Sequence, residues 1–286
     1  MLEEWLRAHV SMLSAEIGER HIYHPRALHA AADYIRSRWS AQGYEVASQT
    51  YQLEGVLSEN IEVTRAGAKR AGEICLVGAH YDTVPGSPGA NDNASGVAAL
   101  IEMSRLFTEL VPATTVRFVA CVNEVPPYFF SRRMGSAVYA RAAKLRGDDI
   151  RLMISLETLG CYSDLPGSQH YPPLFKYFYP DQANFIAFVS NLRSRGMLRS
   201  FAKAFRANSD FPAEDLATWA LVPGVAWSDH LSFWREGYPA LMVTDTALYR
   251  YRYYHTALDT ADKLDYRRFA QVTEGLYRAL AALSGE

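Results

Sequence analysis

Residues 74–121 decide the fold, and they begin with the stretch ICLVGAHYDTVPGSPGANDNASG at residues 74–96. The apolar run Ile74–Ala79 is typical of a buried strand, and Thr115–Cys121 is typical of a second one. Between them, apolar side chains recur at three- and four-residue intervals over residues 94–110, which predicts a helix. The order strand, helix, strand is the unit of a mostly parallel sheet with helices on both faces, so the sequence predicts an α/β fold of three layers.

The same alternation continues on both sides of this unit. Helices are expected at residues 2–17, 26–42, 135–145 and 266–283, and strands at 44–52, 151–156, 184–189, 217–227 and 240–244. Residues 161–181 are rich in Pro, Tyr and Phe without periodicity, which indicates a long loop in front of the sheet. Because no Ser-, Gly- or Pro-rich linker separates two blocks, residues 1–286 are expected to form one domain.

Composition limits the classes of protein and partner. The chain has 286 residues, of which 49% are hydrophobic and 21% charged, with a net charge of -2. These values fit a soluble globular protein, and the scattered Lys and Arg form no basic face for nucleic acid. Nothing in the sequence indicates an oligomeric state.

The sequence also gives expectations about location. No run approaches the ~18 apolar residues of a membrane span. Glu3 and Glu4 interrupt the region where a signal peptide would carry its apolar core. Cys75, Cys121 and Cys161 are widely spaced and are expected to be free thiols. We therefore expect a cytoplasmic protein that does not associate with membranes.

Candidate ligands for a metal ion lie at the end of the first apolar strand and at the start of the helix that follows it. Molecules that bind to open α/β sheets do so beyond the C-terminal ends of the strands. His80 lies at such an end, and Asp82 two residues later could take the second N–H of an imidazole that binds a cation. The pair is equally typical of a simple hydrogen bond, and Asp92, at the start of the next helix, is equally typical of an N-cap.

Three more residues complete the candidate site. Glu124, in the stretch NEVPP at residues 123–127, is held on a stiff turn that suits a general base, although a solvated loop Glu is the more common interpretation. Glu157 directly follows an apolar run, where a carboxylate is costly unless it is paired or metal-bound. His255 comes late in the chain and alone would more often be structural. Together the mixed nitrogen and oxygen ligands suit zinc, with cobalt or manganese as alternatives.

Five stretches of the chain carry a family resemblance. GAHYDTVPGSPGANDNASG, NEVPPYF with MGSAVYA after it, SLETLG, SDHLSFW and YHTALDT resemble, in order and spacing, the co-catalytic zinc exopeptidase family. That family includes bacterial leucyl aminopeptidases and, more distantly, animal glutaminyl cyclases. The resemblance covers nearly the whole chain from about residue 20. It implies that His80 binds one zinc, that Asp82 orients His80, that Asp92 bridges two zincs, and that Glu157 and His255 complete the other site.

One position departs from the family. Family members carry a Glu-Glu pair after the second strand, the first as general base and the second as zinc ligand. Aligned on Pro126-Pro127, this pair is Glu124 and Val125, and valine cannot bind a metal. A register shifted by one would instead make Glu124 the ligand and put Asn123 at the base position.

The departure changes the expected metal content. With Val125 in the ligand position, one zinc site would keep Asp92, Glu157 and His255, which is the usual catalytic set of three protein ligands. The other would keep only His80 and the shared Asp92. One strong zinc site and a second that is weak or empty are therefore expected.

The resemblance implies a metal-dependent aminopeptidase acting on peptides. A zinc-bound water would attack the first peptide bond, and Glu124 would pass its proton to the leaving amine. The aromatic residues of the loop could form a specificity pocket or could simply anchor the loop: Tyr162, Tyr171, Phe175, Tyr177 and Phe178. Asp229 and His230 could help to bind substrate or could support the ligands. Two alternatives remain: a single-zinc glutaminyl cyclase-like acyltransferase, and a family member without turnover that binds peptides or partners. Val125 favours the second alternative.

Overall fold

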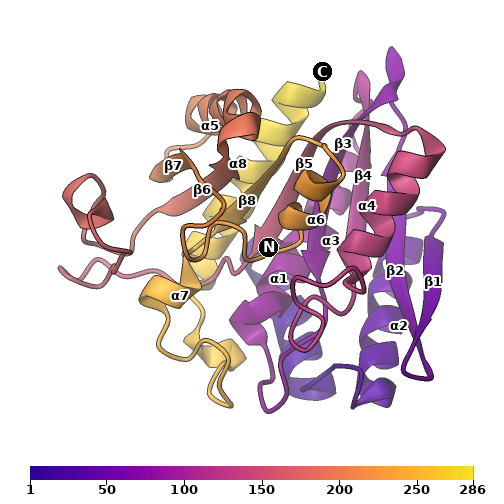
Figure 1. Ribbon diagram of the computed structural model, residues 1–286, viewed down its shortest axis with the longest axis horizontal. Coiled ribbons are helices and arrows are strands. Elements are labelled where there is room, and N and C mark those ends of the chain that lie inside the picture. The colour runs from indigo at the N-terminus through magenta and orange to yellow at the C-terminus, as the bar shows by residue number, and fades with distance from the viewer. Residues whose placement is uncertain (286) are drawn as a thin grey trace.

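The computed structural model describes residues 1–285, and within them one eight-stranded sheet runs through the molecule (Figure 1). Its strand order is β1-β2-β4-β3-β5-β8-β6-β7. The strands are β1 (Ala47–Leu53), β2 (Val56–Arg65), β3 (Arg70–His80), β4 (Thr114–Cys121), β5 (Asp149–Glu157), β6 (Ile186–Asn191), β7 (Ala213–Thr218) and β8 (Ala240–Thr244). The central strands β4, β3, β5 and β8 are parallel, and β6 and β7 are parallel to each other. The pairs β1–β2, β2–β4 and β8–β6 are antiparallel, so the sheet is mixed with a parallel centre.

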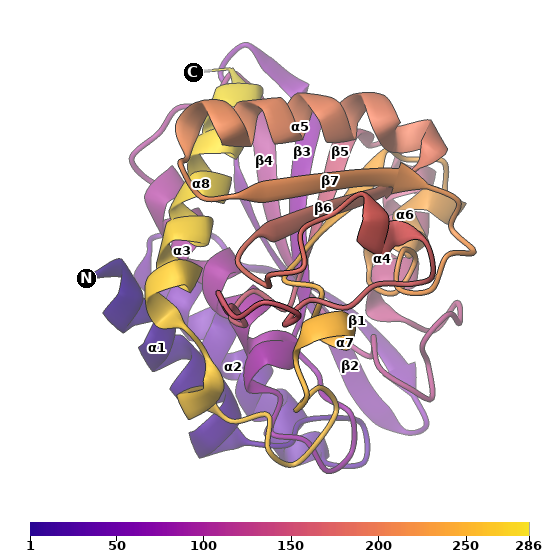
Figure 2. The same ribbon diagram turned by 90° about the vertical axis from the view of Figure 1, so that its left-hand side faces the viewer.

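Helices cover both faces of this sheet, as Figure 2 shows from the side. One face packs against α1 (Leu2–Ser11), α2 (Pro25–Ala41), α3 (Gly96–Phe107), α5 (Arg195–Asn208) and α8 (Tyr266–Ser284). The other face packs against α4 (Gly135–Arg146) and α6 (His230–Arg235), and a short helix, α7 (Ala247–Arg250), follows β8. The predicted three-layer α/β fold is confirmed.

Strand β3 shows how the residue pattern of a strand matches its place in the sheet. Val77 and Cys75 point into the cluster with α3 and α8, whereas Leu76 and Ile74 point into the cluster with α4 and α6. All four side chains are buried, because a central strand of a parallel sheet is covered on both faces. A continuous apolar run, rather than an alternating one, is therefore the correct signal for this strand.

Several elements differ from the prediction. The strand expected at residues 217–227 is wrong beyond Thr218, because a turn through Pro223 and Gly224, the latter with φ 88°, interrupts extended backbone. Strand β2 was not predicted. Helix α5 was not predicted either, although its buried side chains recur at the helical spacing: Leu198, Phe201, Ala202 and Phe205.

The arrangement brings four strand ends to one edge of the sheet. His80 ends β3 and pairs across to Cys121 at the end of β4, and Glu157 ends β5 and pairs across to Thr244 at the end of β8. Side chains that follow these ends therefore meet in one place. No helix within residues 1–285 combines the length and the apolar character needed to cross a lipid bilayer.

Candidate metal centre and the pocket beside it

His80 lies at the middle of the candidate site and is 1% exposed. Its Nδ1 lies 3.1 Å from the backbone oxygen and 3.5 Å from Oδ1 of Asp82. On the other side of the ring, Nε2 lies 3.2 Å from Oδ1 of Asp92 and 3.3 Å from Oε2 of Glu157. Ligand atoms of His80, Asp92 and Glu157 all lie within 4.8 Å of one another, which is close enough for one metal ion to reach all three.

Asp92 connects this cluster to His255. Its Oδ2 lies 2.8 Å from Nε2 of His255, so the two oxygens of one carboxylate face two different imidazoles. The ring of His255 stacks on Tyr254 with a centroid distance of 3.9 Å and an angle of 17°. Helix α3 begins at Gly96, and Asp92 makes no capping bond to it, so the N-cap interpretation of Asp92 does not hold.

Backbone hydrogen bonds hold Asp92 in this place. The carboxylate of Asp259 accepts from the backbone N–H of Asn91 at 2.8 Å and from that of Asp92 at 3.1 Å. Gly89 has φ 61°, and a Cβ there would lie 2.4 Å from the Asp92 carbonyl oxygen, so only glycine fits. The late segment of the chain thus fixes a loop that lies almost 170 residues earlier.

Asp82 fixes the turn that carries the candidate base. Its carboxylate accepts hydrogen bonds from the backbone N–H groups of Glu124 and Val125, each at 3.2 Å. Oε2 of Glu124 lies 3.9 Å from Nε2 of His80, beyond hydrogen-bond distance. Burial raises the pKa of Glu124 well above its usual range, and His80 only partly offsets that effect. A carboxyl group with a raised pKa suits a group that must both accept and release a proton.

The charges of the cluster fit a bound cation. Nδ1 of His80 faces only acceptors on Asp82, so it carries a proton, and Nε2 faces the oxygens of Asp92 and Glu157. Burial alone would lower the pKa of His80, but Glu124 and Glu157 raise it well above its usual range. Two imidazoles and two carboxylates in this arrangement are a donor set that zinc prefers.

The grouping of the ligands differs from the expected one. We expected Glu157 to share a metal with His255, but the structure places Glu157 beside His80. The physical reason is the strand order, since β3 and β5 are neighbours and their ends bring these two side chains together. The geometry therefore favours His80, Asp92 and Glu157 as one candidate set, and Asp92 and His255 as a second candidate set.

Comparisons with known proteins assign the family. The sequence profile described as Peptidase family M28 matches residues 60–280. The chain belongs to this family. The M28 chain is 39% identical over 272 residues to the uncharacterized protein YfbL of Escherichia coli strain K12, a match that covers 90% of this chain and 83% of that protein. It is 26% identical over 234 residues to the probable aminopeptidase YDR415C of Saccharomyces cerevisiae, covering 75% of this chain but 54% of that relative.

Solved structures share the M28 chain's fold. BSAP, a zinc aminopeptidase from Bacillus subtilis, superimposes with a TM-score of 0.78 at 15% identity, over 98% of this chain and 95% of that one. A glutaminyl cyclase of Bacteroides thetaiotaomicron, bound to N-acetylhistamine, superimposes with a TM-score of 0.72 at 19% identity, over 98% and 97% of the two chains. At such identities the likeness concerns the fold alone.

The pair Asp229 and His230 divides into two different environments. Nε2 of His230 lies 2.8 Å from the backbone oxygen of Val225, and its ring packs edge-on against Trp234, so this residue belongs to the packing of α6. Burial lowers the pKa of His230 to about 4. Asp229 is fully buried, and neither of its oxygens accepts a hydrogen bond from any side chain or backbone group that the structure describes. Burial raises the pKa of Asp229 to about 6, partly offset by His80.

Sequence reasoning missed Ser228, the residue before this pair. Its hydroxyl donates to Oε2 of Glu157 at 2.8 Å, which is the same oxygen that faces His80. The hydroxyl also lies 2.8 Å from that of Ser155. Ser228 therefore orients the carboxylate of Glu157. The only available signal was its position directly before Asp229 in the SDHLSFW stretch.

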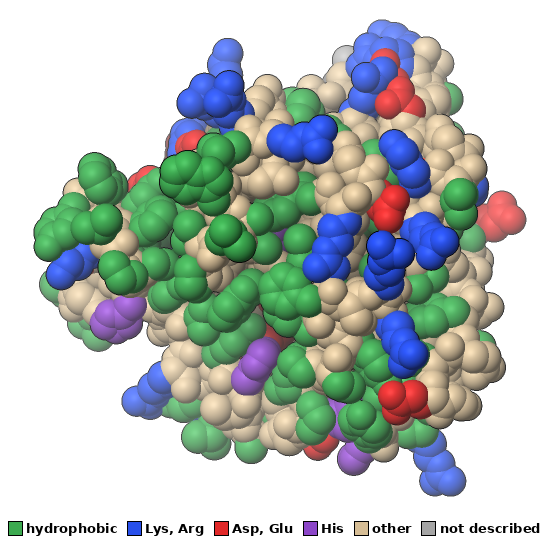
Figure 3. Space-filling model, in the orientation of Figure 1, with side chains coloured by type: hydrophobic (Ala, Val, Ile, Leu, Met, Phe, Trp, Pro, Cys, Tyr) green, Lys and Arg blue, Asp and Glu red, His purple; other side chains and the backbone are tan. Residues whose placement is uncertain are grey.

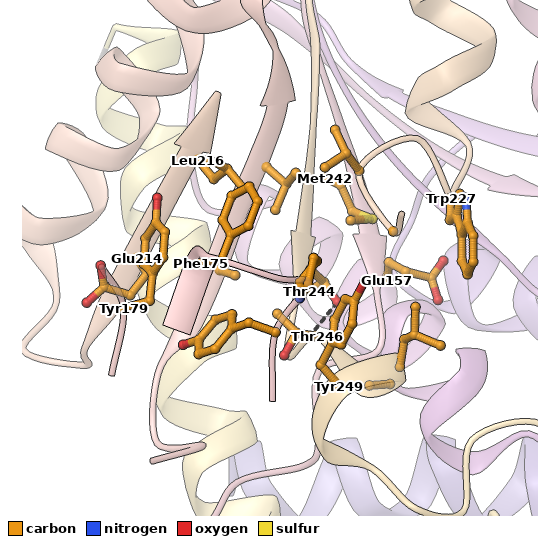
Figure 4. Close-up of a pocket in the computed structure, with 18 of the residues that line it drawn as sticks. Glu157, Phe175, Tyr179, Glu214, Leu216, Trp227, Met242, Thr244, Thr246 and Tyr249 are labelled. Carbon is orange, nitrogen blue, oxygen red and sulfur yellow. Dashed lines mark hydrogen bonds between the residues drawn. The ribbon is translucent and has the colours of Figure 1, made fainter. Parts of the chain in front are cut away.

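A large pocket opens beside Glu157 and runs away from it over β8, β6 and β7 (Figure 4). It contains about 860 Å³ of empty space, part of it open to solvent. Apolar and aromatic side chains from the strands and from the two flanking segments dominate its wall: Tyr171, Phe175, Phe185, Val189, Leu216, Val222, Trp227, Met242 and Tyr249. Such walls are typical of sites for small molecules or side chains.

The segment 161–181 forms only part of this wall. Tyr171 and Phe175 line the pocket, as the sequence suggested. Tyr162 instead packs edge-on against Phe211 at 5.2 Å. Tyr177 and Phe178 are 72% and 80% exposed. Figure 3 shows hydrophobic side chains gathered at the left of the molecule, where Figure 1 draws the segment between β5 and β6. Two of the five aromatic candidates therefore lie in the wall of the pocket, and the other three do not line it.

Proposed function

We propose that the chain is a metal-dependent aminopeptidase that removes N-terminal residues from peptides. The observation that carries this proposal is the convergence of the Asp92 and Glu157 carboxylates on one imidazole nitrogen of His80, at the mouth of an apolar pocket. Membership of Peptidase family M28 and the aminopeptidase names among the relatives support it. An apolar pocket directly beside the candidate metal ligands suits recognition of the side chain of a terminal residue.

We assign the strong metal site to His80, Asp92 and Glu157, and a weaker one to Asp92 and His255. Bound zinc would supply Lewis acidity, which polarises a carbonyl group and lowers the pKa of water. The ligands come from strand ends and from a loop that Asp259 holds by its backbone, so their positions are fixed before any ligand arrives. Such preorganisation favours catalysis because little reorganisation is needed in the transition state.

Glu124 is the general base of this proposal. Its carboxylate takes a proton from the attacking water and passes it to the leaving amine. The distance of 3.9 Å to His80 leaves it free of a strong ion pair, and the two backbone bonds to Asp82 keep its turn in place. Asp82 therefore positions both the imidazole of His80 and the turn that carries Glu124.

One observation favours a second candidate, a peptide-binding protein without turnover. Val125 is 4% exposed and follows the proposed base directly, and its apolar side chain offers no metal ligand. Loss of one metal would leave binding intact and reduce the rate.

Metal analysis and turnover distinguish these functions. The purified chain should contain about one equivalent of zinc and should release nitroaniline from aminoacyl-nitroanilides, and a chelator should abolish the release. A His80→Ala variant should lose both the metal and the activity. Cyclisation of N-terminal glutamine without peptide cleavage would support the glutaminyl cyclase-like alternative. No turnover with zinc, cobalt or manganese would reject the aminopeptidase and favour the binding protein.

A further inference from the structure

A second carboxylate lies in the same row of the sheet as Glu157. Glu157 pairs with Thr244 on β8, Thr244 pairs with Ala187 on β6, and Ala187 pairs with Glu214 on β7. All four residues line the pocket. The row therefore begins at a proposed metal ligand and ends at a carboxylate on the edge strand.

The side chain of Glu214 faces the pocket. Directly paired residues of neighbouring strands point to the same face, and Leu216, the next residue on that face of β7, pairs with the buried Val189 and also lines the pocket. Asp215, which lies between Glu214 and Leu216, points the other way and binds Arg206 of α5 at 2.6 Å. Figure 4 shows Glu214 at one end of the pocket, next to Tyr179, and Glu157 at the other end.

The Glu214 carboxylate is free to bind a ligand. It makes no hydrogen bond and no ion pair with any residue of the described range 1–285, whereas Arg206 is already committed to Asp215 and to the backbone oxygen of Ala213. Aromatic rings surround this end of the pocket. Tyr179 lies 5.9 Å from Tyr171 and stacks on Phe175 at 6.4 Å, centroid to centroid. A carboxylate beside aromatic faces attracts an organic cation.

The length of the row selects the kind of side chain. Three strand spacings of about 4.8 Å separate Glu157 from Glu214 by about 14 Å. A ligand whose reacting group lies at Glu157 must therefore extend along most of this row to contact Glu214. An extended arginine or lysine side chain reaches about 6 to 7 Å beyond its Cα, at about 1.5 Å per bond, whereas a leucine side chain stops roughly halfway. The apolar wall between the two ends suits the methylene stem of a basic side chain.

We propose that this pocket selects peptides whose N-terminal residue is arginine or lysine, with Glu214 binding the cationic tip. The inference rests on the proposed aminopeptidase function and narrows its substrate class. Glu214 acts as a specificity residue: it touches the tip of the substrate side chain at the far end of the row from Glu157 and takes no part in the proton transfer.

Arginine and citrulline nitroanilides test the proposal, because citrulline keeps the shape of arginine without its charge. The zinc-loaded wild type should show a kcat/KM about tenfold higher for arginine than for citrulline, as expected for a partly exposed ion pair with cation–π support. Glu214→Gln should bring this ratio close to one. Asp215→Asn, the matched control on the same strand but facing α5, should keep the ratio of the wild type.

The outcomes separate this inference from the proposed function. Cleavage of leucine nitroanilide with equal kcat/KM for arginine and citrulline would keep the aminopeptidase and overturn the inference, and so would a Glu214→Gln ratio equal to that of the wild type. If no substrate is cleaved, the proposed function fails, and calorimetry with arginine amide and citrulline amide decides the inference instead. Tighter binding of arginine amide that Glu214→Gln abolishes supports it; equal binding rejects it.

Discussion

Glu157 and Glu214 are the same residue type in the same row of the sheet, but their carboxylates differ in exposure and in hydrogen-bond partners. Glu157 is 7% exposed, and its Oε2 receives a hydrogen bond from Ser228 and faces His80. Glu214 is partly exposed and has no partner within the part of the chain that the structure describes. A carboxylate that must hold a metal is fixed in advance, whereas one that meets a variable substrate tip is left free.

The backbone also differs between the two ends of this row, which are the metal end at Glu157 and the pocket end at Glu214. The loop at the metal end is bound to the carboxylate of Asp259 and to the buried guanidinium of Arg20, which together fix its backbone. The segment above the pocket has little regular structure, and Arg250 connects to it through the side chain of Gln169 at 2.7 Å and to the backbone oxygen of Phe185 at 2.9 Å. We therefore expect substitutions at the metal end to have large effects and those at the pocket end to have small ones.

The largest effect is expected for Glu124→Gln. The amide cannot accept a proton, so kcat should fall by about 10²- to 10⁴-fold, the range for loss of a general base. Zinc content and the midpoint of urea unfolding should stay at wild-type values, because the turn is held by backbone bonds to Asp82. Steady-state kinetics on an aminoacyl-nitroanilide measures the change. A loss of less than tenfold would move the proton transfer to another group, such as the buried Asp229.

The next effect concerns the stability of the metal end. Arg20 is 0% exposed and donates to the backbone oxygens of Tyr81 at 2.6 Å, Pro88 at 2.7 Å and Gly89 at 3.0 Å, among others. Arg20→Met leaves these acceptors without donors, so the free energy of unfolding should fall by about 3 to 5 kcal/mol. Urea denaturation followed by circular dichroism measures it.

A matched control uses an arginine at the other end of the row. Arg206 is 45% exposed in its ion pair with Asp215, and Arg206→Met should cost less than about 1 kcal/mol. Equal losses for the two variants would contradict the view that the metal end is the rigid one.

The sequence predicted the metal end well because parallel strands place their C-terminal ends together. Acids and imidazoles directly after apolar runs, such as His80 and Glu157, could be assigned to one edge without knowing the strand order. The grouping of these residues around a metal ion could not be predicted in the same way. It depends on β3 lying beside β5, and chain order alone does not reveal which strands are neighbours.

The pocket end gave almost no sequence signal. Strand β7 reads AEDLAT, and two adjacent acids in a short polar run are typical of a solvent-exposed loop. Only its register with β6 shows that Glu214 and Asp215 face opposite sides. Arg20 was also overlooked, because nothing in the stretch GERH distinguishes a buried guanidinium from an exposed one.

A smaller effect is expected for Val125→Glu, which restores the family's Glu-Glu pair. The new carboxylate replaces a side chain that is 4% exposed, so it is costly without a cation and favourable with one. Zinc should rise from about one equivalent toward two, and kcat/KM should rise by up to about tenfold. Zinc should also raise the melting temperature more than in the wild type.

Val125→Gln separates metal binding from packing in this experiment, because glutamine has the shape of glutamate without its charge. It should bind no more zinc than the wild type. If Val125→Glu changes neither the zinc content nor the rate, the missing ligand does not limit the activity.

The smallest effect is a pH dependence at the pocket end. Burial raises the pKa of Glu214, with Arg206 opposing and Asp215 adding to the shift. Arginine stays charged throughout, so its advantage over citrulline exists only while Glu214 is ionised. The ratio of the two kcat/KM values should therefore be constant at high pH and decline as pH falls through the raised pKa, above the ~4.3 of an ordinary glutamate. Because both substrates share the metal end, titration of Glu124 or His80 cancels in this ratio, and Glu214→Gln should give a flat profile. A wild-type ratio that is equally flat between pH 8 and the acid limit of folding would mean that the carboxylate does not contact the substrate.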